Sequence, residues 1–420
     1  MTDEKLIGRS IIGASAPPLD KSRQAAVAVT DHVVRMSVIV IDDLTALEKY
    51  VPAWEDLAAA AIEPNAFYEP WMTLPAIRAF KAGHRLQFAL VMAHQPSRSF
   101  DAPLLCGVFP LERQNHYQGL SRSLPFKTLR LWKHKYCYLC TPLVRAGYGT
   151  QVIEAFFDWL HAGSHNCSLM EFRFIAGDGP FSSLLIDYFE RHAKLHYVST
   201  YFLRALFRPT FDVDAYLCEA LSSKHRKALR RQEGQLSEIG RLEYDALTQD
   251  DDVGMWIEEF LQLESSGWKG REGSAIASTE ADRTYFKSIA KEAFRRGQLS
   301  MLALRLDGRP IAYKCDFLSG RGQFTFRIAF DENYGRNSPG MLLEIEQIRR
   351  LHALSRIEWV DSCTDPSNFM FNRIWMARRT VQDVVIGAGK SVGDWVVAAI
   401  PLLKLLNRKL LRSNAGVADE

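Results

Sequence analysis

The chain has 420 residues, a length that predicts two or three domains at about 150 residues each. Hydrophobic residues make up 47% and charged residues 24%, which excludes a disordered chain, a collagen-like chain and a disulfide-stabilised miniprotein. The 52 Lys and Arg residues against 49 Asp and Glu leave a net charge of +3, so the overall charge does not indicate a nucleic-acid partner. Seven scattered cysteines, an odd number, favour a reducing compartment over a disulfide framework.

The N-terminal segment shows no hydrophobic period and contains Pro17-Pro18 among many alanines and serines, so we expect a flexible leader over residues 1–34. It has no apolar core of signal-peptide length, and no window of about 18 apolar residues occurs in the chain. The sequence therefore predicts a cytoplasmic protein without a membrane-spanning helix.

The C-terminal tail, residues 391–420, contains the apolar run Trp395–Leu403, followed by the basic residues Lys404, Arg408, Lys409 and Arg412. Two interpretations stay open. The tail is either a terminal helix docked on the body or a basic amphipathic helix that contacts the inner membrane face. Pro401 argues against one continuous helix.

The first half of the chain reads as helices followed by strands. We expect helices over 43–61 and 72–81, strands over 86–93, 104–113 and 129–139, a glycine-rich turn at 143–149, a helix over 150–161, a strand over 169–175 and a helix over 181–192.

The second half follows a similar scheme. We expect helices over 222–239, 250–266, 279–296 and 340–354, strands over 241–246, 299–306, 311–318, 323–330 and 357–361, a glycine-rich loop at 267–275 and a turn at 331–339.

This pattern is an internal repeat. In each half, an antiparallel meander leads through a turn and a helix to a last strand, over about 20 residues from Gly149 to Leu169 and from Gly340 to Ile357. A strand that follows such a helix lies parallel to the strand before it. The predicted fold class is α+β, with two tandem domains over 35–200 and 201–390. Each domain has a mixed, mostly antiparallel sheet flanked by helices.

The turn before the last helix carries the most chemical information. Ser338 is a good N-cap, and Pro339 suits the first helical turn. Gly340 would let a diphosphate approach the backbone, where free amides and the helix dipole favour an anion, and Arg336 could add charge. The alternative is a well-capped helix without a ligand.

This arrangement resembles the GNAT acyltransferase fold, and its tandem form resembles the Fem-type peptidoglycan aminoacyltransferases. The chain looks most similar to the GNAT-type acetyltransferase family associated with bacterial cellulose biosynthesis, the CelD type. The matching residues are 261–270 (LQLESSGWKG), Ala303, Ala312-Tyr313-Lys314, Ser338-Pro339-Gly340 and Asp361-Ser362-Cys363.

The resemblance implies transfer of an acyl group from acetyl-CoA, or another acyl-CoA, to an amine or hydroxyl in exopolysaccharide or envelope biosynthesis, without a metal. It places coenzyme A on Arg336, Asn337, Ser338, Gly340 and Met341. The family's usual turn has glycine where this chain has Pro339, and glycine or alanine where it has Met341. In this family, the second half is expected to be active and the first to be a degenerate copy that helps to build the acceptor cleft.

The same resemblance suggests residues for the chemistry. Glu264, Tyr313 and Asp361 are candidate catalytic acids or bases, because Asp361 ends the strand after the coenzyme A helix, Tyr313 lies on the meander and Glu264 precedes a flexible loop. The candidate substrate-binding residues are Trp268, Lys269, Lys314 and Arg327. A structural role, such as a salt bridge, is the alternative for each of them.

Two other functions stay open. Lys224, Lys227 and Arg231 share one face of a basic helix that could bind a phosphate of coenzyme A, of a lipid-linked saccharide or of tRNA. If the phosphate belongs to a lipid-linked saccharide, the acceptor is a saccharide. If it belongs to tRNA, the chain is a Fem-type aminoacyl-tRNA-dependent transferase. A non-catalytic accessory protein of polysaccharide synthesis is the other alternative. No DNA partner is expected.

The remaining motifs indicate structure more than chemistry. Cys137 and Cys140 lie in an alternating apolar strand, so we expect them to pack in the core on opposite faces and not to bind zinc. His116 and His134 lack ligand spacing. The polar stretch 361–375 either shapes an acceptor pocket or caps the sheet. The absence of a nucleophile elbow and of a P-loop disfavours hydrolase and NTPase functions.

Overall fold

The computed structural model describes residues 34–94, 103–118, 123–163, 165–210, 212–353, 356–389 and 391–415, with side chains of the last helix described from Val392 to Leu405. The predicted leader lies outside these residues except for Val34. Among the described residues, no helix has the length and apolar character needed to cross a membrane.

The first half contains a four-stranded antiparallel meander, a crossover helix and a returning strand. Its strands are β1 (Arg35–Ile41), β2 (Arg85–His94), β3 (Leu104–Gln114), β4 (Thr128–Leu131), β5 (Leu143–Val144) and β6 (Leu169–Ala176), and its α-helices are α1 (Leu44–Glu48), α2 (Val51–Ala59), α3 (Pro70–Phe80), α4 (Gly149–Ala162) and α5 (Pro180–Arg191).

The second half repeats this plan. Its strands are β8 (Leu242–Ala246), β9 (Leu299–Leu306), β10 (Arg309–Ser319), β11 (Gly322–Phe330) and β12 (Trp359–Asp361), and its helices are α6 (Val213–Ala220), α7 (Ser223–Ile239), α8 (Val253–Ser266), α9 (Trp268–Arg271), α10 (Glu280–Arg295), the 3₁₀ helix η3 (Glu332–Asn337), α11 (Pro339–Ala353) and α12 (Phe369–Ile374).

With β7 (His196–Phe207) and β13 (Ala377–Gly387), these strands form one mixed sheet with the order β1-β2-β3-β4-β6-β13-β7-β12-β11-β10-β9-β8, and β5 pairs with β3. β4 pairs with β6 in parallel, and β11 pairs with β12 in parallel, while the other pairs are antiparallel. The predicted mixed sheet, its tandem repeat and its two parallel crossovers are therefore confirmed. Where one domain ends and the next begins stays a prediction.

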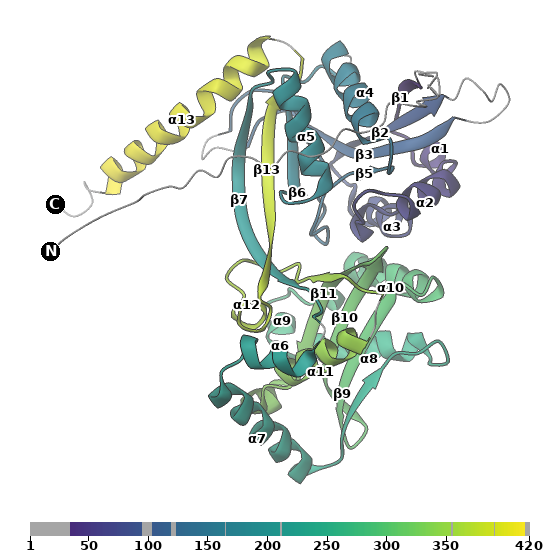
Figure 1. Cartoon of the computed structure of the whole chain (residues 1–420), viewed down its shortest axis with the longest axis vertical. Helices are drawn as coiled ribbons and strands as arrows, with labels where there is room; N and C mark the ends of the chain where they lie inside the picture. Colours follow the sequence, from purple (N-terminus) through teal and green to yellow (C-terminus); the bar gives the residue numbers. More distant parts are fainter. Residues whose placement is uncertain are drawn as a thin grey trace, which may run out of the picture.

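Two long strands that the sequence analysis did not predict connect the halves. β7 (His196–Phe207) and β13 (Ala377–Gly387) form an antiparallel pair in the middle of the sheet (Figure 1). β13 follows the second half in sequence but pairs with β6 of the first half, so the chain crosses back. Both strands carry polar and charged residues between apolar ones, and β7 is largely exposed before Ala205, which weakened their hydrophobic signal.

Other predicted elements differ in their bounds. The predicted strand over 129–139 ends at Leu131, and residues 132–142 form a loop. Cys137 and Cys140 are buried in this loop as predicted, but their Sγ atoms lie 3.6 Å apart. The expectation that they face opposite sides was wrong, because it assumed an extended strand. The predicted helix 43–61 is split into α1 and α2, and α13 (Ser391–Ala415) continues through Pro401.

The two halves share an apolar core. Phe67 of the first half packs edge-on against Phe324 of β11, with ring centroids 5.3 Å apart, and Tyr136 stacks on Tyr285 of α10 at 5.6 Å. Since these rings come from both halves, the second-half sheet and the loop 132–142 are fixed relative to each other.

Candidate functional site

The sheet forks between β11 and β12. These two strands pair only over Gly322–Phe324 and Trp359–Asp361, although β11 continues to Phe330. A register shift on the other edge of β11 places one extra residue, Phe326, between the paired positions of Thr325 and Arg327. The backbone of β11 after Phe324 therefore has no strand partner on the β12 side.

A cleft of 790 Å³ opens at this fork. Its walls come from α7, the start of α9, the free part of β11, the N-terminus of α11 and the polar stretch that leads from β12 through α12. Its lining residues include Tyr138, His225, Gln232, Trp268, Lys269, Thr325, Arg327, Ile328, Ser338, Gly340, Met341 and Cys363. The sequence alone did not decide whether the stretch 361–375 shapes a pocket or caps the sheet, and the structure shows that it contributes to a wall of the cleft.

The N-terminus of α11 forms one end of the cleft but offers fewer free amides than expected. The Ser338 carbonyl accepts hydrogen bonds from the amides of Met341 (2.9 Å) and Leu342 (3.1 Å), and the Ser338 amide donates to Gly335. Among the described residues, the Gly340 amide makes no hydrogen bond, and Pro339 has none to offer. The prediction of Ser338 as an N-cap was wrong: among the described residues its hydroxyl caps no helix amide, and its φ of +52° is not the extended conformation that an N-cap residue adopts.

Gly340 keeps space in the cleft. A Cβ atom there would lie 3.7 Å from Ile328 and 3.8 Å from Phe330, which is ordinary contact, and the residue does not have a positive φ. The fold therefore does not require glycine at this position. The open space and the free amide both fit the approach of a phosphate group or a thioester arm.

The other two residues of the predicted coenzyme A turn point elsewhere. The Arg336 carbonyl accepts a hydrogen bond from Gln232 of α7 at 2.8 Å, and the Asn337 side chain donates to Gln232 and Gln235. Neither residue lines the cleft. Of the five predicted residues, the structure brings Ser338, Gly340 and Met341 to the cleft.

Backbone strain is present at the cleft. Ser338 and Cys363 are non-glycine residues with φ of +52° and +53°, and both line it. Such residues are uncommon and cost free energy, and they gather at functional sites. Their presence in the lining is consistent with a functional cleft.

Lys269 connects the loop after α8 to the free edge of β11. Its Nζ donates to the Ile328 carbonyl at 2.8 Å and to Glu264 Oε1 at 3.1 Å. Burial lowers the pKa of Lys269, while the carboxylate of Glu264 opposes that shift. Glu264 itself is only 2% exposed, and its second oxygen accepts from the Ile276 amide, so it reaches the cleft through Lys269.

The other predicted substrate residues divide into two groups. Trp268 and Arg327 line the cleft, and the Arg327 guanidinium lies over the ring of Tyr136 at 5.6 Å. Lys314 does not reach it. Its Nζ forms a buried ion pair with Glu344 at 2.5 Å, under α11.

Two predicted catalytic residues also lie outside the cleft. The Tyr313 hydroxyl donates to Glu259 at 2.5 Å and accepts from Arg305 at 3.0 Å. Asp361 is fully buried next to Ser362 and Cys363, where its Oδ2 atom accepts from two arginines. Both residues have structural partners that use their polar atoms, and their catalytic roles stay predictions.

Tyr138 is a cleft residue that the sequence analysis missed. It belongs to the loop 132–142 of the first half and contacts Phe326 of β11, with ring centroids 5.9 Å apart. Among the described residues, its hydroxyl makes no hydrogen bond, and burial raises its pKa to about 12. No pattern in the sequence marks it, because its position depends on how the loop packs against the other half.

Thr325 connects the cleft to a buried polar cluster. It pairs across the sheet with Asp316, whose Oδ2 accepts from Gln323 and Gln347 at 2.6 Å each. Burial raises the pKa values of Asp316 and Glu344, although Lys314 opposes the shift. Among the described residues, Asp316 Oδ1, Thr325 Oγ1 and Gln347 Oε1 are buried without a well-aligned hydrogen bond, although the Thr325 hydroxyl lies near enough to Asp316 to help lower the pKa of that carboxyl. Buried polar atoms normally are paired, so this floor of the cleft is suited to a hydrogen-bonding ligand or water.

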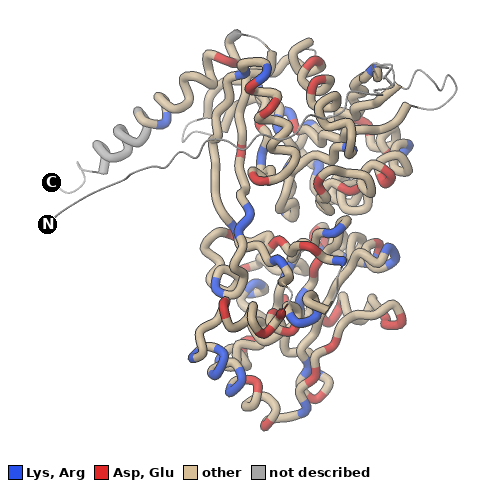
Figure 2. The backbone as a smooth tube through the Cα atoms, viewed as in Figure 1, with Lys and Arg blue, Asp and Glu red and all other residues tan. Residues whose placement is uncertain are grey.

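Basic residues gather on α7, the helix that forms one wall of the cleft (Figure 2). Ser222 caps this helix by accepting a hydrogen bond from the His225 amide. Within the described part of the chain, no ion pair involves Lys224, Lys227, Arg230 or Arg231. Lys227 and Arg230 lie on the side of α7 opposite its cleft-lining residues, so these cations can attract an anion to the helix but do not line the cleft.

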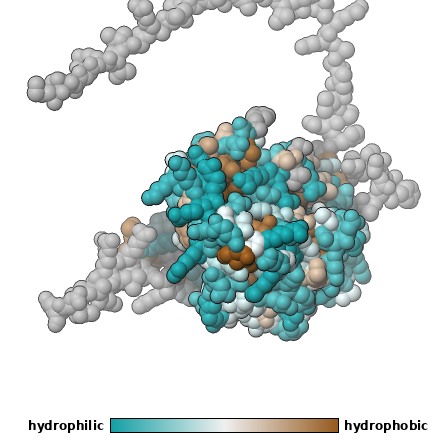
Figure 3. Space-filling model, turned by 90° about the horizontal axis from the view of Figure 1, so that it is seen from below, coloured by the Kyte–Doolittle hydropathy of each residue, from teal (hydrophilic) through white to brown (hydrophobic). Residues whose placement is uncertain are grey.

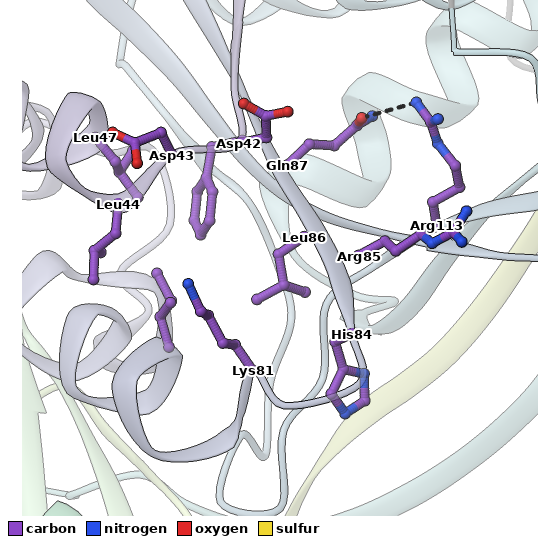
Figure 4. A pocket seen from close by; sticks show the side chains of 12 residues that line it. Asp42, Asp43, Leu44, Leu47, Lys81, His84, Arg85, Leu86, Gln87 and Arg113 are labelled. Atoms are coloured by element: carbon purple, nitrogen blue, oxygen red, sulfur yellow. Dashed lines mark hydrogen bonds between the residues drawn. The ribbon is translucent and has the colours of Figure 1, made fainter.

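Two further cavities contain none of the predicted site residues. One of 380 Å³ lies between α1, α3 and β2, where Arg113 donates to Gln87 (Figure 4). The other, of 360 Å³, shares Leu229 with the cleft and lies along the adjacent face of α7. Seen from the second-half end, the molecule shows an apolar hollow within a hydrophilic rim (Figure 3). No three His, Cys, Asp or Glu side chains in the described ranges are grouped to hold a metal ion.

Comparison with known families matches one family model to the segment that contains β11 and β12, the strands of the fork. Residues 223–369 match the family model described as "Acetyltransferase (GNAT) domain". The second half contains a GNAT domain. This match covers α7 to the start of α12, and so includes every cleft wall except Tyr138, Leu221 and the last residues of α12. No curated protein matches the chain.

Solved structures show the same architecture at low identity. FemX is 8% identical, covers 83% of this chain and 98% of its own, and superposes with a TM-score of 0.52. Similar matches include a tandem GNAT protein from the clavulanic acid biosynthesis pathway (12% identity, 85% and 100% coverage, TM-score 0.41). A third is the C-terminal domain of a putative lysylphosphatidylglycerol synthetase from Agrobacterium fabrum (13% identity, 86% and 96% coverage, TM-score 0.47). The likeness to FemX shows the fold alone, and the cellulose-associated type stays a prediction.

Proposed function

We propose that this chain is an acyltransferase that moves an acyl group from acyl-CoA to an amine or hydroxyl acceptor. The observation that carries the proposal is the cleft at the fork of β11 and β12, which meets the N-terminus of α11 within the GNAT domain. GNAT domains generally use acyl-CoA donors. An acceptor in exopolysaccharide or envelope synthesis is proposed on the resemblance alone.

The residues at the cleft suggest how a donor would be held. The Gly340 amide and the apolar side chains of Ile328 and Met341 suit a thioester arm, while the cations of α7, which lie outside the cleft lining, would have to meet the phosphates beyond it. This chain offers one free amide at the turn, so it would depend on α7 for the phosphates.

Acyl transfer forms a bond from the acceptor nitrogen or oxygen to the acyl carbon and breaks the carbon–sulfur bond. The acceptor loses a proton, and the leaving sulfur gains one. We assign the second role to Tyr138, because its phenol is half-buried at the fork, is protonated and, among the described residues, makes no other hydrogen bond. Lys269 and Arg327 would orient the acceptor from the opposite wall.

The test is thermal unfolding with and without acetyl-CoA, with dephospho-CoA and ATP as controls. A ligand at about 100 times its Kd stabilises by roughly 2.7 kcal/mol, a shift of a few degrees. Gly340→Leu should abolish the shift by filling the cleft. The matched control, Gly234→Leu on the open side of α7, should keep it, because nothing lies within 4 Å of a Cβ there. No shift at millimolar acetyl-CoA would contradict the proposal.

One observation favours a second candidate, an aminoacyl-tRNA-dependent transferase. Five Lys and Arg residues and no acidic residue occur over 221–232. This segment contacts the turn before α11, where Gln232 donates a hydrogen bond to the Arg336 carbonyl. Binding of tRNA that falls steeply with salt, without binding of acetyl-CoA, would favour this candidate. Binding of neither ligand would favour a non-catalytic accessory protein.

A further inference from the structure

The last helix, α13, has two apolar sides. Val396, Val397 and Ile400 are buried against the sheet in a cluster with Leu169 and Val385. Four other apolar side chains of α13 are exposed: Val392 (54%), Trp395 (77%), Leu402 (59%) and Leu405 (56%). At about 100° per residue, Trp395, Leu402 and Leu405 lie on the side of the helix opposite the buried three, and Val392 lies at the flank.

An exposed tryptophan and two leucines on one helix are not needed to fold the body. The buried side chains already attach α13 to β13 and β7, and Lys404 donates to the Ser199 carbonyl at 2.9 Å. Beyond this attachment, the helix extends away from the sheet (Figure 1). The outer side of α13 is therefore an apolar surface that the described part of the chain leaves uncovered.

The charge of α13 distinguishes between the possible partners of this apolar surface. The sequence 395–415 contains Lys404, Arg408, Lys409 and Arg412 and no acidic residue. The acidic residue of the helix, Asp394, is paired with Lys194 at 3.1 Å. A second copy of the same basic helix would be repelled, whereas an anionic lipid surface accepts both the cations and the apolar side chains. A nucleic acid would accept the cations but gains little from exposed leucines.

We infer that α13 docks this protein on an anionic membrane surface, lying in the interface with Trp395, Leu402 and Leu405 toward the lipid. The inference does not depend on the proposed acyl transfer, because it concerns a surface separate from the cleft. If both hold, the cleft works on a body held at a membrane, where a lipid-borne acceptor would be concentrated.

The test is co-sedimentation of the full chain with vesicles of phosphatidylcholine alone or with about 30% phosphatidylglycerol. We expect binding to the anionic vesicles, and loss of most binding in about 0.5 M salt. The double variant Trp395→Ser, Leu402→Ser should weaken binding at least tenfold, given about 1.5–3 kcal/mol for each buried apolar side chain. Because both side chains are exposed, the thermal unfolding of the variant should match that of the parent.

The matched control is the double variant Met255→Ser, Ile239→Ser, which removes two exposed apolar side chains elsewhere (49% and 61% exposed) and should bind as the parent does. Absence of binding to anionic vesicles, or equal loss in both double variants, would overturn the inference. A change of oligomeric state in the α13 variant without vesicle binding would assign the surface to a second copy. Binding of RNA in place of vesicles would also overturn the inference. Acetyl-CoA binding is measured separately, so failure of one proposal leaves the other standing.

Discussion

Arg204 Nη2 of β7 lies 2.7 Å from Asp361 Oδ2 of β12, and Arg379 Nη1 of β13 lies 2.8 Å from the same oxygen. All three side chains are buried. These side chains join β7 and β13, the two long strands that link the halves, to β12, the strand next to the cleft. One carboxylate therefore fixes the fork of the sheet relative to the first half.

Asp361→Asn should strongly destabilise the fold, because it leaves two buried guanidinium groups without a counter-charge. Removing one partner of a buried ion pair costs about 3–5 kcal/mol. Chemical denaturation measures this loss. The control is Asp365→Asn, four residues away at the surface, whose carboxylate bonds only to Ser367 and whose loss should cost under about 1 kcal/mol. Equal effects would contradict this role for Asp361.

The same group predicts an acid limb in stability. Burial alone would raise the pKa of Asp361, but Arg204 and Arg379 hold it below its usual range. The ion pair therefore stabilises the fold above the unfolded-state pKa of about 4, and this stabilisation is lost as pH falls through the lower folded-state pKa. Urea denaturation between pH 2 and 5 should show a steep fall in the parent that Asp361→Asn lacks.

The carboxyl group of Glu63 should make the stability of the fold depend on pH in the opposite direction. Burial raises its pKa from 4.5 to about 7, and its Oε1 has no partner among the described residues, while Oε2 accepts from the Phe181 amide at 3.5 Å. The folded state binds more protons than the unfolded state between these values, so stability falls as pH rises from 4.5 to 7.

The cost of ionising Glu63 in the folded state is about 3 kcal/mol. Glu63→Gln should therefore raise stability at pH 8 by a fraction of that amount and flatten the profile between pH 5 and 7. Thermal unfolding at pH 5 and pH 8 measures both effects. A larger gain at pH 5 than at pH 8 would contradict the argument.

Tyr138→Phe tests the proposed proton donor. Its hydroxyl makes no hydrogen bond among the described residues, so the variant should keep its thermal stability and its shift with acetyl-CoA. The rate of acyl transfer at saturating donor should fall by about 10² or more, because that is the usual contribution of a general acid. Tyr136→Phe is the matched control, since it removes a phenol hydroxyl of the same loop that does not line the cleft. Equal rates in the two variants would exclude Tyr138 from this role.

The sequence predicted what depends on local patterns. The meander β9–β11, the turn at Ser338-Pro339-Gly340 and the crossover to β12 follow from alternation, turn residues and helix period, and all are confirmed. β7 and β13 were missed because polar side chains such as Thr200 and Gln382 interrupt their apolar pattern.

The site was predicted less well than the fold. Lys269, Arg327 and Gly340 reach the cleft, whereas Lys314 and Tyr313 lie on the same meander but turn to partners away from it. Their direction depends on which face of β10 is covered by α11 and which by α8, and a single strand pattern does not distinguish these faces. Tyr138 depends on contact between the halves, which leaves no local signal.

Thr325 gives a prediction in which stability and activity move in opposite directions. Among the described residues, its Oγ1 is buried without a well-aligned hydrogen bond at the floor of the cleft, so Thr325→Val removes a poorly paired polar group at almost constant shape. The variant should be more stable by about 1 kcal/mol. If the hydroxyl contacts substrate, kcat/KM should fall even though the fold is stabilised.

The matched control is Thr141→Val, which should be destabilised by about 1–3 kcal/mol, because the buried Thr141 hydroxyl accepts a hydrogen bond from the Ala176 amide at 3.0 Å. Denaturant midpoints compare the two variants, and steady-state rates of acyl transfer test the substrate contact. A destabilised Thr325→Val would show that this hydroxyl is paired in the free protein, through water or Asp316. The argument for a ligand-binding floor would then fail.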